Sequence, residues 1–137
     1  MEFVSIEAAG LVPKGRERWS EFQDNATATM SDYFGTLLKN VIISGFPKRF
    51  DMVSNDCQIV GDAKWKALPM DGAARKVLFE EISTYVWLLE KIKASRRFIV
   101  FGNDMRVPEA WLRKYGGLPT TVEFYFWDGK GSVIRLV

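Results

Sequence analysis

Two aspartates and a lysine, Asp51, Asp62 and Lys64, are the residues in this sequence best suited to chemistry. The runs at 49–53 and 59–68 are rich in strand-forming residues, and the short segment between them consists mostly of turn-forming residues. This pattern predicts a β-hairpin with Asp51 on its first strand and Asp62 and Lys64 on its second.

Whether the three side chains meet depends on the loop of that hairpin. Side chains alternate along a strand, so Asp62 and Lys64 share one face. A two-residue loop at Asn55–Asp56 would place Asp51 diagonal to Asp62, and a four-residue loop at Asn55–Gln58 would place the two aspartates directly opposite each other. A three-residue loop would reverse the parity and separate the carboxylates.

Two neighbouring carboxylates repel each other unless a cation lies between them. Mg²⁺, or Mn²⁺ in its place, is held by one or two carboxylates, keeps several waters and accepts a phosphate oxygen. Lys64 could then orient an attacking water or neutralise charge on the phosphate. The predicted chemistry is therefore magnesium-dependent hydrolysis of a phosphodiester.

The composition excludes several other kinds of site. The chain has no His and one Cys, Cys57, so it cannot form a Ser-His-Asp triad, a Cys-His pair, a Cys/His zinc site or an internal disulfide. The net charge of +2 is only mildly basic and permits an acidic partner through a local patch. Glu2 and Glu7 disfavour a secretory signal, and no apolar run is long enough to span a bilayer, so we expect a soluble, cytoplasmic protein.

The length of 137 residues suits one domain over 1–137. The first predicted helix covers 16–38, with Gly35 as an alternative, earlier end. The other predicted elements are a loop over 69–76, a helix over 78–94, a buried strand over 96–102, a short helix over 108–115 and strands over 122–127 and 132–137. A strand that follows a crossover helix favours an α/β fold, with a mixed central sheet flanked by helices.

This order of elements, together with FD, ten residues and then DAK, resembles the PD-(D/E)XK nucleases, the restriction-endonuclease-like superfamily, over most of residues 15–105. The resemblance implies a restriction-endonuclease-like core. It also implies that Asp51 and Asp62 bind the metal, that the backbone carbonyl of Ala63 is a further ligand, and that Lys64 is the catalytic lysine.

The sequence departs from the family's pattern in two places. Phe50 stands before Asp51, where the family has proline. The family often adds a carboxylate from the first helix, and Glu21 is the candidate metal ligand there, although the helical wheel turns it away from the apolar stripe unless the helix is distorted. Gln23 is better directed but uncharged.

Three basic residues near the hairpin, Lys48, Arg49 and Lys66, could follow the backbone of a nucleic acid, either DNA or RNA, although ordinary surface charge is the simpler interpretation. Trp65 could stack on a base. Because it alternates with Lys64, it points to the opposite face, so core packing is preferred for it.

Two further alternatives concern partners and activity. A chain this small would need a homodimer to bind a duplex, and the EFYFW segment at 123–127 is either its interface or part of the core. The competing function is a non-catalytic nucleic-acid or protein-binding module that retains the nuclease-like fold. A third interpretation treats Asp62 and Lys64 as an ordinary surface pair.

Overall fold

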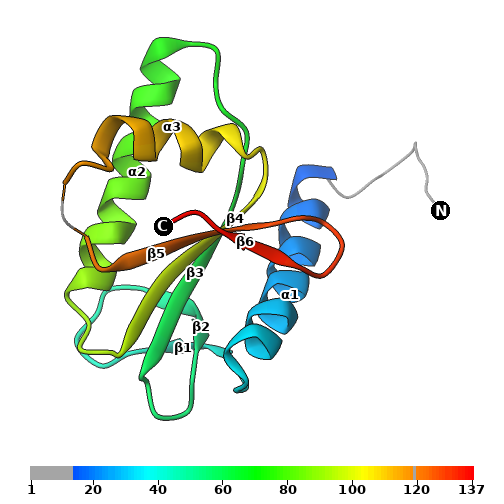
Figure 1. Ribbon diagram of the computed structural model, residues 1–137, viewed down its shortest axis with the longest axis vertical. Coiled ribbons are helices and arrows are strands. Elements are labelled where there is room, and N and C mark those ends of the chain that lie inside the picture. Colours follow the sequence, from blue (N-terminus) through cyan, green and yellow to red (C-terminus); the bar gives the residue numbers. More distant parts are fainter. Residues whose placement is uncertain (1–13, 119) are drawn as a thin grey trace.

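Six strands form a single sheet in which they lie side by side in chain order (Figure 1). The computed structural model describes residues 14–118 and 120–137, and residues 1–13, on which the expectation about a secretory signal rests, lie outside them. The strands are β1 (Lys39–Ile42), β2 (Arg49–Val53), β3 (Ile59–Lys66), β4 (Arg96–Asn103), β5 (Val122–Trp127) and β6 (Val133–Arg135).

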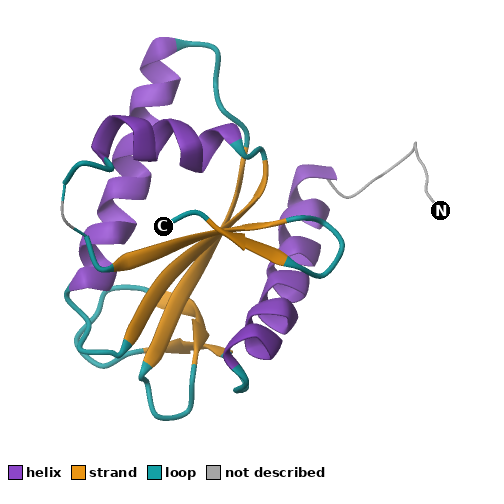
Figure 2. Ribbon diagram, viewed as in Figure 1, coloured by secondary structure: helices purple, strands orange, loops and turns teal. Residues whose placement is uncertain are grey.

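The three described helices lie on both faces of this sheet (Figure 2). Helix α1 (Lys14–Phe34) covers one face, and α2 (Gly72–Glu90) and α3 (Arg106–Tyr115) cover the other. The central strands β3, β4 and β5 are parallel, and the remaining neighbours are antiparallel. The predicted α/β class with a mixed central sheet is therefore confirmed. No helix in the described ranges is both long and apolar enough to cross a membrane.

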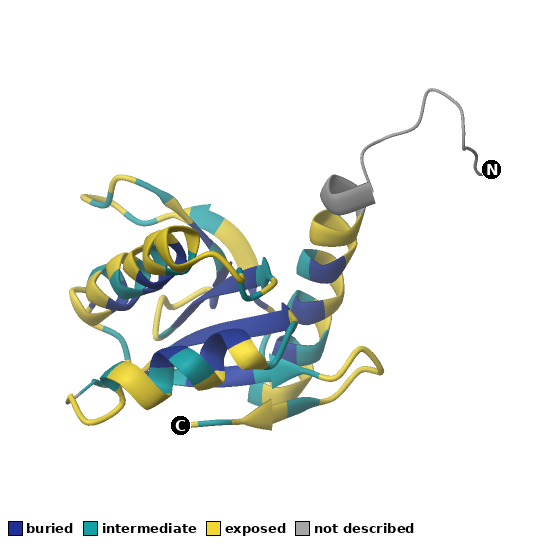
Figure 3. Ribbon diagram, turned by 90° about the horizontal axis from the view of Figure 1, so that it is seen from above, coloured by how far each residue is buried: buried dark blue, intermediate teal, exposed yellow. Residues whose placement is uncertain are grey.

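Each face of the sheet has its own apolar core. The central strands that separate the two cores are mostly buried (Figure 3). On β4, Phe98 packs toward α1 and Ile99 toward α2, as expected of a strand that is covered on both sides. Phe124 and Tyr125 on β5 are likewise fully buried on opposite faces. The EFYFW segment therefore contributes to the core.

The start of α2 differs from the prediction, whereas the end of α1 follows the earlier alternative at Gly35. Helix α2 begins at Gly72, so most of the expected loop at 69–76 is helical. Asp71 caps this helix because its side chain accepts a hydrogen bond from the backbone N–H of Ala74, which has no partner within the first turn. Helix α1 ends at Phe34 because Gly35 adopts the left-handed conformation (φ +69°).

Candidate active site

The loop between β2 and β3 has four residues, Asn55–Gln58. The backbone N–H of Ser54 donates to the carbonyl of Ile59 at 3.0 Å, and the next two residue pairs continue this register. Extending the register by one more pair brings Asp51 opposite Asp62. The hairpin therefore has the four-residue loop at Asn55–Gln58, the alternative that places the two aspartates directly opposite each other in the register.

The backbone ladder between β2 and β3 stops just before the two aspartates. Its last pair is Met52 with Gly61. Beyond it, the N–H of Asp51 donates to Oδ1 of Asp62 at 3.1 Å, and the N–H of Ala63 donates to Oδ2 of Asp51 at 2.9 Å. The two carboxylates lie between the strands and act as acceptors in place of main-chain carbonyls. They satisfy two backbone N–H groups that would have no partner once the strands separate.

This separation also breaks the alternation of side chains on β2. Phe50 packs in the core beside α2 and α3, whereas Met52, two residues later, packs in the core beside α1. The carboxylate of Asp51 is turned toward α1, where its Oδ1 accepts from Nε2 of Gln23 at 3.0 Å. Asp62 faces the α2 side, so the two aspartates meet across the gap between the strands and do not share one face of the sheet. The reason is that the regular alternation of side chains on β2 does not extend to Asp51.

The environment of Asp51 favours its protonated form. Burial, and then the negative charge of Asp62, raise the pKa of Asp51 to about 6, against the opposing effects of the Ala63 N–H and the charge of Lys48. The side-chain amide of Asn40 is also within 3.4 Å of its Oδ1. A cation near this carboxylate would therefore be favourable.

A lysine already supplies positive charge to Asp62. The side chain of Asp62 is only 2% exposed, and Nζ of Lys48 lies 2.5 Å from its Oδ2. The same ammonium lies over the rings of Phe50 and Tyr85, 4.3 and 4.8 Å from their centroids. Lys48 therefore reaches into the site, where the sequence pattern suggested a surface charge.

Lys64 is held by α2. Its Nζ lies 2.7 Å from Oε2 of Glu81 and 3.3 Å from the centroid of the Tyr85 ring. Burial lowers the pKa of Lys64, although its hydrogen bond to Glu81 opposes the change. For Glu81, burial acts to raise the pKa, but the bond and charge of Lys64 and the charge of Lys66, 3.7 Å away, outweigh it and leave the pKa below its ordinary value. The hydrogen bond between Lys64 and Glu81 therefore favours the charged form of each side chain.

The remaining candidates lie around these groups. Glu21 is exposed and is not among the groups that contact the carboxylates, and Gln23 is the α1 side chain that reaches Asp51. Arg49 is exposed and donates to Oδ1 of Asn40 at 2.6 Å. The carbonyl of Ala63 points to the same side of β3 as its N–H, toward β2 and the aspartates.

Two members of the site, Glu81 and Tyr85, were not recognised from the sequence, and Lys48 was expected only to contact a nucleic acid or solvent. Glu81 and Tyr85 are four residues apart, so they share one face of α2, and this spacing was a usable signal. The contact of Lys48 with Asp62 had no such signal, because Lys48 follows an irregular segment before β2.

The residues at the gap carry oxygen atoms of the kind that a divalent cation takes as ligands. Within residues 14–118 and 120–137, no group of three or more His, Cys, Asp or Glu side chains is placed to bind a metal. The donors are the carboxylates of Asp51 and Asp62 and the carbonyl of Ala63, which are oxygen groups of the kind that Mg²⁺ or Mn²⁺ takes. The side-chain amide of Gln23 presents its nitrogen to Asp51, and the ammonium of Lys48 lies on Asp62. The ammonium of Lys48 on Asp62 and the raised pKa of Asp51 both indicate a place that favours positive charge.

One match to a solved structure supports the fold. No protein-family model matches the chain, and no curated protein matches it. The solved structure of the CdiA-CT/CdiI toxin and immunity complex from Burkholderia pseudomallei contains a chain with 17% identity and a TM-score of 0.57, and the match covers 95% of this chain and 92% of that one. SfsA from Pyrococcus furiosus, solved with Ca²⁺, is 14% identical with a TM-score of 0.43, over 89% of this chain and 62% of that one.

Proposed function

We propose that the chain is a metal-dependent nuclease of the PD-(D/E)XK type, which adds water across a phosphodiester bond. The observation that carries this proposal is the placement of Asp51 and Asp62 in the gap between β2 and β3, where each carboxylate bonds to the backbone of the other strand. Lys64 follows two residues after Asp62 on the same face of β3. A surface ion pair would not need carboxylates that replace sheet hydrogen bonds.

The side chains of the site would have different roles in this reaction. Asp51 and Asp62, with the carbonyl oxygen of Ala63, would hold one Mg²⁺ or Mn²⁺. When bound, that ion supplies polarisation of the phosphate and a lower pKa for a coordinated water. Lys64, held by its contacts to α2, would keep its positive charge beside the scissile phosphate, where negative charge develops.

The charges of the whole site are consistent with a phosphodiester substrate. Lys48, Lys64 and Lys66 lie among three carboxylates, those of Asp51, Asp62 and Glu81, so the protein groups come close to neutrality. A divalent cation would give the site a net positive charge. This is the sign that a phosphodiester requires.

The proposal extends to the partners. The substrate is a nucleic acid, DNA or RNA, whose backbone would run past Arg49 and Lys66 at the ends of β2 and β3. A second copy of the chain would be needed to hold a duplex. We place this activity in the cytoplasm.

The test is a cleavage assay of the full chain with Mn²⁺ and separate single-stranded and duplex DNA and RNA substrates. We expect Asp62→Asn and Lys64→Ala to lower the rate by about 100-fold or more, as loss of a metal ligand or of a charge that stabilises the transition state does. Asp32→Asn and Lys93→Ala, at exposed positions, are the matched controls and should cleave like the wild type. Equal cleavage by Asp62→Asn and the wild type would reject the proposal.

One observation favours the non-catalytic alternative, a nucleic-acid-binding module. Gln23 occupies the place beside Asp51 where a third carboxylate would strengthen a metal site. In such a module, nucleic acid binds equally well with EDTA, and Asp62→Asn leaves binding unchanged. The variant Gln23→Glu separates the two functions, because it should increase Mn²⁺ affinity only if the gap is a metal site.

A further inference from the structure

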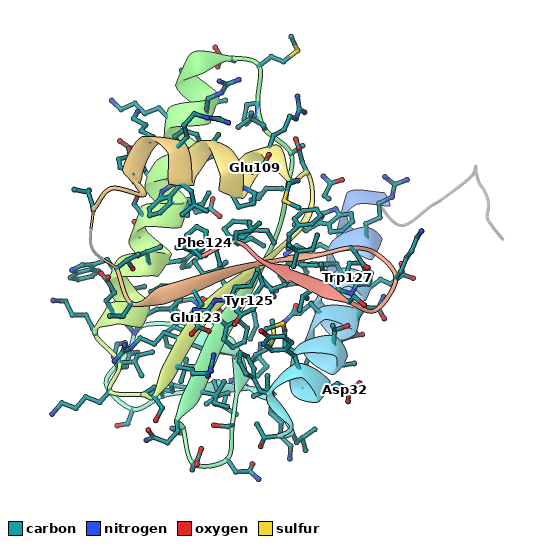
Figure 4. The ribbon with its side chains drawn as sticks, viewed as in Figure 1. Asp32, Glu109, Glu123, Phe124, Tyr125 and Trp127 are labelled. Carbon is teal, nitrogen blue, oxygen red and sulfur yellow. The ribbon has the colours of Figure 1, made fainter. Side chains whose placement is uncertain are left out.

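A recess of about 350 Å³ opens at the carboxyl ends of the parallel strands β3, β4 and β5, against α1. Its walls include the last or next-to-last residue of each strand, which are Trp65, Asn103 and Trp127. Figure 4 shows Trp127 at the end of β5, close to α1. In open α/β sheets, this edge of the parallel strands is where ligands bind.

The interior of the recess is aromatic. Phe22 from α1 lies between the two tryptophans, with ring centroids 5.1 Å from Trp65 and 5.7 Å from Trp127. The backbone of Gly102 makes this close packing possible, since a Cβ there would lie 2.5 Å from the Phe22 ring and 2.8 Å from Trp65. Both tryptophans are half-buried, so each packs on Phe22 and still contributes to the wall of the recess.

The polar groups of the recess suit a neutral ligand. Arg18 and Glu21 line the wall with opposite charges, and Asn25 and Asn103 add amide side chains. Nucleobases carry ring nitrogens and carbonyls that accept from such donors, and they have flat faces that stack on aromatic rings.

The recess also lies within reach of the carboxylates. Trp65 is three residues beyond Asp62 on β3, about 10 Å along the strand. That distance equals about three base steps of a stacked strand. Because Asp51 turns toward α1 and bonds to Gln23, next to Phe22, its carboxylate and the recess lie on the same side of the sheet, whereas Asp62 and Lys64 face α2.

We propose that this recess binds one unpaired nucleobase of a single-stranded substrate, close to the phosphate that is cleaved. The proposal rests on the proposed nuclease function and adds a substrate class to it, namely a single strand with an unstacked base. Trp65 and Trp127 supply the stacking surface, and the amides of Asn25 and Asn103 contact the edge of the base.

The first experiment measures binding of the full chain to short single-stranded oligonucleotides in EDTA, so that no cleavage occurs. One oligonucleotide carries adenine throughout, and the other has the same backbone with an abasic site at its centre. We expect the abasic oligonucleotide to bind about 5- to 150-fold more weakly, the effect of losing one stacked base. Equal affinities would overturn the proposal.

Variants then locate the effect. Trp65→Leu and Trp127→Leu should abolish the difference between the two oligonucleotides, whereas Trp65→Phe should retain part of it. Trp87→Leu, an exposed tryptophan on α2, is the matched control and should keep the full difference. A difference that survives in both recess variants would overturn the proposal.

A measurement on the wild type covers the case in which the leucine variants do not fold. An oligonucleotide with 5-iodouracil at its centre is photo-crosslinked to the protein, and the crosslinked peptide is identified by mass spectrometry. The expected peptide contains Trp65 or Trp127. Crosslinks confined to other peptides would overturn the proposal.

The Mn²⁺ cleavage assay keeps the two proposals apart. Cleavage with equal affinity for both oligonucleotides would overturn the recess and leave the nuclease intact. Base-dependent binding without cleavage would reject the nuclease and support the recess as part of a binding module. Absence of any binding would overturn the recess proposal.

Discussion

The two halves of β3 belong to one continuous strand, but different interactions hold each half against β2. From Ile59 to Gly61, β3 pairs with β2 through backbone hydrogen bonds, and its side chains pack in apolar cores. From Asp62 to Lys66, the backbone of β2 has moved away, and carboxylates and ammonium groups fill the space. Pairing with β4 is continuous along both halves.

The difference shows how a sheet can keep acidic side chains in its interior. A buried carboxylate is costly unless hydrogen bonds and opposite charge compensate it. Here the carboxylates of Asp51 and Asp62 accept hydrogen bonds from backbone N–H groups that have no partner in the interrupted ladder, and Lys48 supplies a positive charge. The polar half therefore depends on charge balance, whereas the regular half depends on close packing.

The largest effect is expected from Lys48→Met in the polar half. Met keeps the contacts with the aromatic rings but removes the ammonium from Asp62, so we expect unfolding free energy to fall by about 3 kcal/mol at neutral pH. Urea unfolding measures this loss. If the gap binds a divalent cation, Mg²⁺ should restore part of the stability.

The control for this variant is Arg106→Met, which breaks an ion pair with Asp104 whose arginine side chain is 70% exposed. Its cost should stay below about 1 kcal/mol. Similar losses for the two variants would mean that the polar half does not depend on charge balance as described.

Gly61→Ala tests the regular half. A Cβ at Gly61 would lie within 2.3 Å of the Phe98 ring, which is fully buried, so we expect a loss of about 2 kcal/mol from overpacking. Gly72→Ala has open space at its Cβ and should cost nothing measurable. Thermal unfolding of both variants checks the prediction, and Mg²⁺ should not rescue Gly61→Ala.

Asp51→Asn should stabilise the protein, in contrast to the two changes above. The pKa of Asp51 in the folded chain is about 6, above its ordinary value of 3.8. The folded state therefore binds the proton more tightly, and the wild type loses stability as the pH rises between these two values. The difference between the two pKa values limits the gain from removing the charge to about 3 kcal/mol near pH 7.5, and the gain should nearly disappear near pH 4.

Urea unfolding at the two pH values measures this change. The variant should also lose any stabilisation by Mg²⁺, which separates the role of Asp51 in cation binding from its cost to the fold. A gain in stability that does not depend on pH would contradict the assigned pKa.

The smallest loss of stability is expected in the loop between β2 and β3, next to the regular half of β3. The Ser54 hydroxyl accepts from the N–H of Ile59 and donates to Asp56, so Ser54→Ala should cost about 1 kcal/mol. Asn55→Ala, at the exposed tip, is the control. Hydrogen exchange of the Ile59 amide should increase in Ser54→Ala, without a change at Asp62.

Local patterns in the sequence were enough to predict most of the fold. Strand-forming runs around turn residues predicted the hairpin, and the apolar run at 96–102 predicted a strand buried on both faces. The start of α2 was missed because its first turn carries no apolar stripe and depends on the cap at Asp71. Capping is a local signal that periodicity does not contain.

Only part of the candidate site could be predicted from local sequence patterns. The sequence by itself determined that Asp51, Asp62 and Lys64 would occupy two adjacent strands, because strand pairing and alternation are local properties of the chain. Only the tertiary structure decided that β2 separates from β3 at Asp51, and that Lys48, Gln23 and the α2 residues converge there. Those contacts join segments distant in sequence, and their positions follow from packing against two cores.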